Sequence, residues 1–385
     1  MSATGLQKEL HVLHVVGARP NFMKAAPVIR ALSGRPGIRQ SIVHTGQHYD
    51  EGMSAVFFRE LSIPQPDVNL EVGSGSHAVQ TAEIMKHFEP VLLERKPDLV
   101  LVYGDVNSTV AAALVCAKRL VPVGHVEAGL RSFDRTMPEE INRLLTDQMA
   151  DLLFTPSEDG DANLAREGVA AEKIHFVGNV MIDTVCASLP AAEGRWPVRG
   201  LKATLGSRNN VDDVIAAAKA FGFVTLHRPS NVDDPDFLLR FMATMDKVSE
   251  ALPLVFTVHP RTRERLTQIG YTPTGEGMLL VEPTGYLDSL VLQSKATVVV
   301  TDSGGLQEET TYLGTPCLTV RENTERPVTV SLGTNTLVGQ DLKLLARAIS
   351  EVLAGSAKSG QAPPLWDGKA AERIADVVEE WGGQQ

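Results

Sequence analysis

The chain has 385 residues, 43% of them hydrophobic, and a net charge of −11, enough for two or three domains with a sizeable core. The negative charge excludes a general binder of nucleic acids, and no apolar run approaches the roughly 20 residues of a membrane span. The polar start at residues 1–9 and the three scattered cysteines predict a cytoplasmic protein without a signal peptide.

The first predicted strand, residues 10–16, ends in Gly17, and a helix is expected over residues 22–33. This opening lacks the three glycines of a dinucleotide fingerprint, so the sequence does not indicate NAD. Arg19 and Lys24 are little more than one helical turn apart and can both face the carboxyl end of the strand. On pattern alone they could instead be two ordinary surface cations.

The second predicted strand, residues 41–45, leads into a turn that contains Gln47 and His48. A turn role for His48 is favoured over a binding role on the sequence alone. Asp105 then follows a predicted strand at residues 98–103, and Glu127 follows one at residues 121–126. Open α/β sheets present catalytic groups at such strand ends, although a lone acid there can also cap a helix.

Pro138 and the two acids after it predict the start of a helix. Glu139 and Arg143 are four residues apart and share a face of that helix. Without further information they would be a solvated ion pair, worth roughly a few tenths of a kcal/mol.

The alternation of strands and helices restarts after a segment rich in Gly, Arg and Pro at residues 191–210, and the second half opens with a strand that ends at His227. Two runs of similar size predict an α/β fold with two doubly wound, Rossmann-like domains facing each other across a cleft. The first comprises residues 1–187, and a C-terminal helix within residues 366–385 is expected to pack back on it. The second comprises residues 188–365.

A predicted buried strand at residues 297–301 is followed by Asp302 and Ser303 as expected caps and by a short helix expected over residues 306–313. Gly304 and Gly305 allow the backbone to approach a ligand closely, and a helix N-terminus favours anions. Ser303 and the Gly304 amide suit a phosphate, while Glu309 suits a neutral diol such as ribose. The alternative is an ordinary capped helix.

The segments DSGGLQEE and LGTPCLTVRENTERP, then Gly333 and the LVG at residues 337–339, resemble the nucleotide-binding half of the UDP-N-acetylglucosamine 2-epimerase family. Further signatures of that family follow in order from Gly17 to Gly339. The resemblance implies a GT-B-type arrangement of the two domains and a non-hydrolysing enzyme that inverts C2 of UDP-N-acetylglucosamine by eliminating and re-adding UDP. This reaction needs no redox cofactor, and the sequence has no His/Cys/Asp cluster with metal-ligand spacing, so neither a cofactor nor a metal is expected.

Carried over residue by residue, the resemblance implies acid/base or sugar-positioning roles for Asp105, Glu127 and Glu139, and a diphosphate contact for His227. It implies a phosphate clamp at Arg19, supporting charge at Lys24 and Arg143, and Arg326 near the phosphates. The UDP cradle is expected at Ser303, Gly304, Gly305 and Glu309.

Two departures from the family pattern affect ligand binding. Ser289 stands where many relatives carry an aromatic residue near the uracil ring, so base stacking is expected to be weaker or supplied elsewhere. Gln47 and His48 match a second, activating substrate site of some bacterial relatives, but residues 67–77 lack its arginine. Weak or absent substrate activation is therefore predicted.

Three alternatives remain open on the sequence: a 2-epimerase of a 2,3-diacetamido uronic acid, a hydrolysing 2-epimerase, and a glycosyltransferase on the same scaffold. The expected partners are a UDP-sugar and a second copy of the chain in a homodimer, with no nucleic acid and no membrane. A role in cell-surface polysaccharide biosynthesis is expected.

Overall fold

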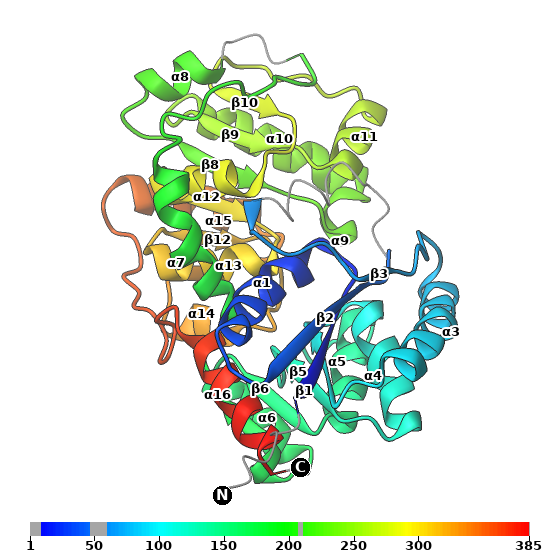
Figure 1. The fold of residues 1–385 in the computed structure, drawn as a ribbon. Helices are drawn as coiled ribbons and strands as arrows, with labels where there is room; N and C mark the ends of the chain where they lie inside the picture. The colour runs from blue at the N-terminus through cyan, green and yellow to red at the C-terminus, as the bar shows by residue number, and fades with distance from the viewer. Residues whose placement is uncertain (1–8, 47–59, 207–210, 385) are drawn as a thin grey trace, which may run out of the picture. The chain divides into compact units, whose positions relative to one another are not determined.

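The computed structural model describes residues 9–46, 60–206 and 211–384, apart from the side chain of Arg19 (Figure 1). Gln47 and His48 lie outside the described residues. The chain divides into two compact units, Met1–Cys186 with Pro364–Gln385, and Ala187–Pro363. No helix within the described ranges combines the length and the apolar composition needed to cross a membrane.

The first unit is built on a parallel sheet in which seven described strands have the order β3-β2-β1-β4-β5-β6-β7. The order reverses between β1 and β4, which makes that edge the switch point where doubly wound sheets bind ligands. The strands are β1 Leu10–Val16, β2 Ile38–His44, β3 Val68–Asn69, β4 Leu99–Tyr103, β5 Val123–Val126, β6 Leu152–Thr155 and β7 Ile174–Phe176.

Helices of the first unit cover this sheet and protect its central strands (Figure 1). Every residue of β4 is buried, as expected for a strand covered on both faces. The helices are α1 Arg19–Ser33, α3 His77–Arg95, α4 Asn107–Arg119, α5 Pro138–Met149, α6 Glu158–Arg166, the 3₁₀ turn η1 Ala171–Lys173, and α16 Ala370–Gly382. Helix α7, Val180–Glu193, carries the chain from the first unit into the second.

The C-terminal helix α16 packs against α1 within the first unit. Asp183 on α7 accepts hydrogen bonds from the backbone N–H groups of Ala370 (3.1 Å) and Ala371 (2.8 Å), and so satisfies the first donors of α16. Arg35 pairs with Asp376 on the same helix. Helix α16 is thus fixed to the first unit by Asp183 at its N-terminus, by Arg35 further along the helix, and by its own buried face.

The second unit repeats the architecture with a parallel sheet of six described strands in the order β10-β9-β8-β11-β12-β13. Its switch point lies between β8 and β11. The strands are β8 Gly222–Thr225, β9 Leu254–Thr257, β10 Met278–Val281, β11 Val298–Thr301, β12 Cys317–Thr319 and β13 Asn335–Leu337. The helices are α8 Val211–Ala217, α9 Pro229–Val232, α10 Pro235–Ser249, α11 Pro260–Gln268, α12 Tyr286–Lys295, α13 Gly304–Leu313, α14 Pro327–Ser331 and α15 Leu342–Leu353.

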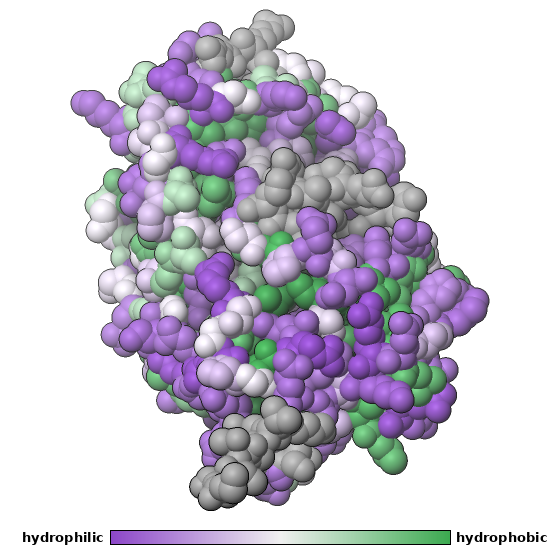
Figure 2. All heavy atoms as spheres, in the orientation of Figure 1, coloured by the Kyte–Doolittle hydropathy of each residue, from purple (hydrophilic) through white to green (hydrophobic). Residues whose placement is uncertain are grey.

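Both sheets confirm the predicted α/β fold of two parallel, doubly wound sheets. Several helix bounds differ from the predictions: α1 begins at Arg19 instead of residue 22, and α13 at Gly304 instead of residue 306. In α1 this is because Pro20 is accommodated in the first turn, where its missing N–H costs nothing. The face drawn in Figure 2 is mostly hydrophilic, with hydrophobic residues scattered among polar ones.

Candidate active site

The switch point of the first unit is fixed by Asn21 in the first turn of α1. Its amide nitrogen donates to the carbonyl of Tyr103 at the end of β4 (2.6 Å), and its oxygen accepts from the N–H of Gly17 (3.1 Å). A Cβ atom on Gly17 would lie 2.1 Å from Oγ1 of Thr45, so no larger residue fits there. The N-terminus of α1, which carries Arg19 and Lys24, is therefore held against the ends of β1 and β4.

Lys24 and Glu127 form a buried ion pair at this edge. The Lys24 Nζ lies 2.8 Å and 2.7 Å from the two carboxylate oxygens of Glu127, and the side chains are only 5% and 3% exposed. The alternative of a surface cation at Lys24 is therefore wrong. The ammonium also lies against Gly104, where an added Cβ would be 2.6 Å from Nζ. Glu127 follows β5 directly with a positive φ of 74°, a conformation that costs a residue with a side chain of order 1 kcal/mol.

Arg143 connects Asp105 to Glu140. Its Nη1 donates to the Asp105 carboxylate, and its Nε and Nη2 donate to Oε2 of Glu140 at 3.1 Å and 2.8 Å. The Arg143 side chain is 2% exposed. The surface ion pair between Glu139 and Arg143 that the spacing allows is not formed: Glu139 is half-buried and makes no ion pair with any other described residue. Nor does Asp105 occupy the N-cap of α4, which is Val106.

Glu140 anchors the loop between β5 and α5. Its carboxylate accepts from the N–H of Ser132 (2.9 Å), the hydroxyl of Ser132 (3.0 Å) and the N–H of Phe133 (2.9 Å), besides the Arg143 guanidinium. Burial acts to raise the pKa of Glu140, but these hydrogen bonds and the Arg143 charge outweigh it and lower the pKa. Glu140 is 1% exposed, which leaves Glu139 as the more accessible acid of the pair.

His125 belongs to a second buried charge cluster, behind the ends of β4 and β5. Its Nδ1 lies 2.6 Å from Oδ1 of Asp147, and its Nε2 lies 2.8 Å from the carbonyl oxygen of Gly104. The other oxygen of Asp147 lies 2.7 Å from Arg131, which in turn pairs with Glu167 at 2.6 Å. His125 and Asp147 were not identified from the sequence, because their contact depends on how α5 packs on β5.

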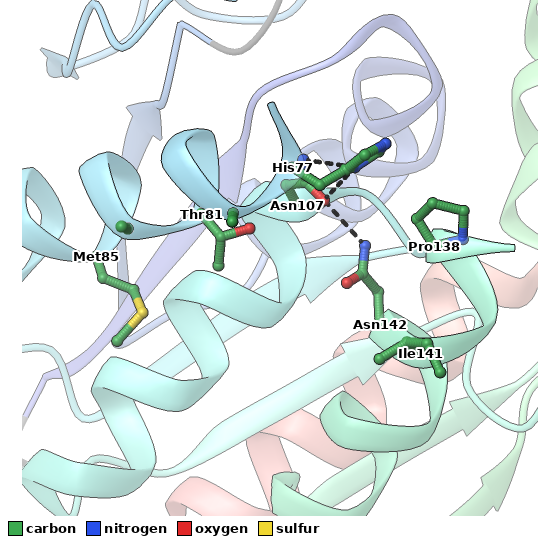
Figure 3. Close-up of a pocket in the computed structure, with 9 residues that line it drawn as sticks. His77, Thr81, Met85, Asn107, Pro138, Ile141 and Asn142 are labelled. Atoms are coloured by element: carbon green, nitrogen blue, oxygen red, sulfur yellow. Dashed lines mark hydrogen bonds between the residues drawn. The ribbon is translucent and has the colours of Figure 1, made fainter. Parts of the chain in front are cut away.

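A shallow groove of about 470 Å³ opens beside Asp105 and Glu139, between α3 and the first turns of α4 and α5 (Figure 3). His77, Asn107 and Asn142 point toward one another at its rim and are joined by hydrogen bonds. Asn142 also donates to the backbone carbonyl of Asp105 at 2.8 Å. Pro138, the residue before Glu139, lines the same groove.

In the second unit, α13 offers an N-terminus free of acidic residues in its first turn. The helix begins at Gly304, so Glu308 and Glu309 fall beyond its first turn, whereas the predicted start at residue 306 would place them within it. Ser303 occupies the N-cap, and a Cβ on Gly304 would lie 2.6 Å from Nη1 of Arg326. Arg326 Nε lies 2.9 Å from Oε1 of Glu308, and the guanidinium also pairs with Glu325.

Asp302 does not cap α13, contrary to the prediction. Its buried carboxylate accepts from the N–H of His227 (3.1 Å), the N–H of Arg228 (2.8 Å) and the amide of Asn231 (3.0 Å), and it lies 2.9 Å from Nδ1 of His227. Burial acts to raise the pKa of Asp302, but the His227 contact and these hydrogen bonds lower it. His227 is thus oriented by its neighbour across the sheet, while 40% of its side chain stays exposed.

Glu309, expected to hold a diol, is 3% exposed and accepts a hydrogen bond from the amide of Gln293 on α12 at 2.8 Å. Gln293 was missed because no local motif marks it.

Within the first unit the structure gathers Lys24, Asp105, Glu127 and Arg143 at the ends of β4 and β5. Within the second it gathers His227, Ser303, Gly304 and Arg326 around the ends of β8 and β11.

Comparison with known proteins finds relatives that match this chain over nearly its whole length and nearly all of their own. The family model for UDP-N-acetylglucosamine 2-epimerase matches residues 30–379. The chain is 41% identical over 369 residues to the UDP-N-acetylglucosamine 2-epimerase of Methanocaldococcus jannaschii (94% of this chain, 97% of the relative). It is 38% identical over 379 residues to the UDP-2,3-diacetamido-2,3-dideoxy-D-glucuronate 2-epimerase of Pseudomonas aeruginosa (96% and 99%).

A solved structure is similar over the same length. The M. jannaschii UDP-GlcNAc 2-epimerase in complex with UDP-GlcNAc and UDP superposes with a TM-score of 0.86 at 40% identity, covering 96% of this chain and all of that one.

Proposed function

Because the chain belongs to the UDP-N-acetylglucosamine 2-epimerase family, we propose that it is a non-hydrolysing enzyme that interconverts UDP-N-acetylglucosamine and UDP-N-acetylmannosamine. The observation that carries the proposal is the pair of carboxylates at adjacent strand ends, Glu127 against Lys24 and Asp105 against Arg143. A carboxylate positioned beside the sugar can take up a proton from C2 or deliver one to it.

The chemistry of the sugar requires such groups. C2 has no neighbouring carbonyl to acidify its hydrogen, so direct deprotonation would leave a poorly stabilised carbanion. Elimination avoids this: a base removes the C2 proton while the C1–O bond to UDP breaks, which gives a 2-acetamidoglucal and UDP. UDP then re-adds at C1 as a proton is delivered to the opposite face of C2. The base and the acid must stand on opposite faces of the ring.

Asp105, Glu127 and Glu139 are the acid/base and sugar-positioning groups in this proposal. Glu139 is half-buried at the start of α5, which supports a contact with a ligand. Its neighbour Glu140 is instead engaged by Ser132 and Arg143 and holds the loop. Arg143 holds the Asp105 carboxylate in place.

The second unit holds the UDP leaving group. The first turn of α13 holds no acidic residue, which supports phosphate binding at Ser303, Gly304 and Gly305, with Arg326 and its partner Glu325 beside Gly304. His227 contacts the diphosphate through its exposed side, because Asp302 occupies Nδ1. Glu309 binds the ribose.

The P. aeruginosa relative favours a second candidate, the 2-epimerisation of a UDP-2,3-diacetamido uronic acid. Its coverage and identity are close to those of the M. jannaschii relative, and both substrates present the same bond to break. We also propose a cytoplasmic location, supported by the buried free thiols of Cys116 and Cys317, and a homodimer in cell-surface polysaccharide synthesis.

The products of the purified enzyme test the proposal. We expect UDP-N-acetylglucosamine to be converted to UDP-N-acetylmannosamine, measured by anion-exchange chromatography with mass detection, and no free UDP to accumulate. Equal amounts of UDP and free N-acetylmannosamine would identify a hydrolysing enzyme. Conversion of the diacetamido uronic acid alone would identify the second candidate, and sugar transfer to an added acceptor a glycosyltransferase.

A further inference from the structure

We propose that His125 is a positioning residue that carries a proton on both ring nitrogens and fixes Asp105 through the carbonyl group of Gly104. The charge of the ring follows from its own contacts. Only the expected effect of His125 on turnover rests on the proposed function. His125 is fully buried on β5, two residues before Glu127.

The contact with Gly104 requires a proton on Nε2. A backbone carbonyl oxygen can only accept a hydrogen bond, and it lies 2.8 Å from Nε2 in a site closed to water. An unprotonated nitrogen there would place two lone pairs face to face, with the carbonyl left unsatisfied. Nε2 must therefore donate.

The contact with Asp147 requires a proton on Nδ1 as well. The second oxygen of this carboxylate already faces the Arg131 guanidinium at 2.7 Å and accepts the N–H of Gly129 at 3.1 Å. A guanidinium and a backbone N–H on that oxygen favour the ionised form of Asp147 independently of His125. An ionised carboxylate only accepts, so the 2.6 Å contact is donated by Nδ1.

The charges of the cluster balance with a doubly protonated ring. His125 and Arg131 are then two cations, and Asp147 and Glu167 two anions, joined in one chain of contacts. With a neutral His125 this chain of contacts would carry one negative charge in excess, at Glu167, whose side chain is 25% exposed.

The imidazolium acts on Asp105 through one peptide group. The N–H of Gly104 donates to the carbonyl of Val126 on β5 at 3.0 Å, and its carbonyl accepts from His125 on the same strand. The carbonyl of Gly104 and the N–H of Asp105 share one rigid plane. Because Gly104 has a positive φ of 61° and no side chain to restrain it, the His125 contact helps to set the direction in which the chain enters Asp105, together with the bonds that Asn142 and Arg143 make to Asp105. β5 thus positions Asp105 relative to its own Glu127.

Two substitutions separate the contacts of the ring. In His125→Gln the side-chain amide reaches about as far as Nε2 and can still donate to Gly104, whereas in His125→Asn it reaches only as far as Nδ1 and keeps Asp147. We expect kcat of His125→Asn to fall about a hundredfold, the usual cost of misplacing a reacting group by about 1 Å, and that of His125→Gln by less than about tenfold. The Kd for UDP, measured by calorimetry, should change in neither. Equal losses in both variants, or a higher Kd for UDP, would overturn the inference.

The charge of the ring is measured on the unmodified protein, without substrate. In ¹⁵N-histidine-labelled protein at pH 8.5, we expect one imidazolium with two slowly exchanging ring N–H groups. Burial lowers the pKa of His11, His14 and His175, so these rings are neutral at that pH. A spectrum with single-proton rings only would overturn the inference. Wild-type protein without epimerase activity would instead count against the proposed function.

Discussion

The Nδ1 atom of His227 lies 2.9 Å from a carboxylate oxygen of Asp302, a residue 75 positions later in the chain that also accepts the backbone N–H of His227 at 3.1 Å. One buried carboxylate therefore fixes both the loop and the ring at the switch point of the second unit. It selects the ring orientation in which Nε2 is the nitrogen available to a ligand.

Replacing Asp302 with Asn should reduce kcat about a hundredfold, because an amide cannot accept all the hydrogen bonds that the carboxylate receives and no longer favours a proton on Nδ1. Steady-state kinetics checks this, with circular dichroism to confirm that the variant folds. An unchanged kcat would show that the orientation of His227 is irrelevant to turnover.

Asp302 also predicts how stability depends on pH. Its pKa is lower in the fold than the ordinary value of 3.8, so its ionised form is favoured by folding. The stabilisation is complete above pH 3.8 and is lost as pH falls through the lower pKa of the folded state. Urea unfolding of wild-type protein should therefore show a steeper loss of stability below about pH 4 than Asp302→Asn shows. Parallel curves would contradict this.

The pair formed by Lys24 and Glu127 should be tested by a double-mutant cycle. Lys24→Met leaves a buried carboxylate without its cation and should cost about 3–5 kcal/mol of the free energy of unfolding. Adding Glu127→Gln removes the carboxylate charge that Lys24 had balanced, so the double variant should regain part of that stability but stay inactive. Recovery of turnover in the double variant would contradict the proposed role of Glu127.

Glu139 and Glu140 make a matched pair of neighbouring acids. Glu139→Gln should reduce kcat about a hundredfold with little change in stability, since the side chain is half-buried and pairs with none of the other described residues. Glu140→Gln should instead lower the free energy of unfolding by about 2–3 kcal/mol, because the amide cannot satisfy Ser132, Phe133 and Arg143 together.

Kinetics and urea unfolding of the two variants separate these effects. Full activity of Glu139→Gln would assign the acid/base role elsewhere, and an undisturbed stability of Glu140→Gln would show that the loop does not depend on this carboxylate.

The sequence predicted the fold and the family because both depend on local patterns. Buried apolar runs followed by turn-forming glycine or proline mark the strand ends, and these hold Asp105, Glu127 and His227 in the structure. It could not predict contacts made across the sheet. The spacing of Glu139 and Arg143 suggested an ion pair, but Arg143 is buried and turns to Asp105, 38 residues earlier.

Helix starts were also missed where glycine or proline forms the first turn. The sequence placed the acids of α13 at its N-terminus, whereas the helix begins at Gly304 and leaves that end free of them. The roles of Asp147, Asp302 and Gln293 depend on partners 16 or more residues away, which no local motif records.

The central claim is that carboxylates of the first unit move a proton at C2 while UDP leaves C1. Proton NMR of the reaction with UDP-N-acetylglucosamine in deuterated water tests it most directly. We expect the C2 proton signal to disappear from the UDP-N-acetylmannosamine formed, because solvent deuterium is delivered to C2. Product that keeps its C2 proton in full would rule out proton exchange at C2 by these carboxylates.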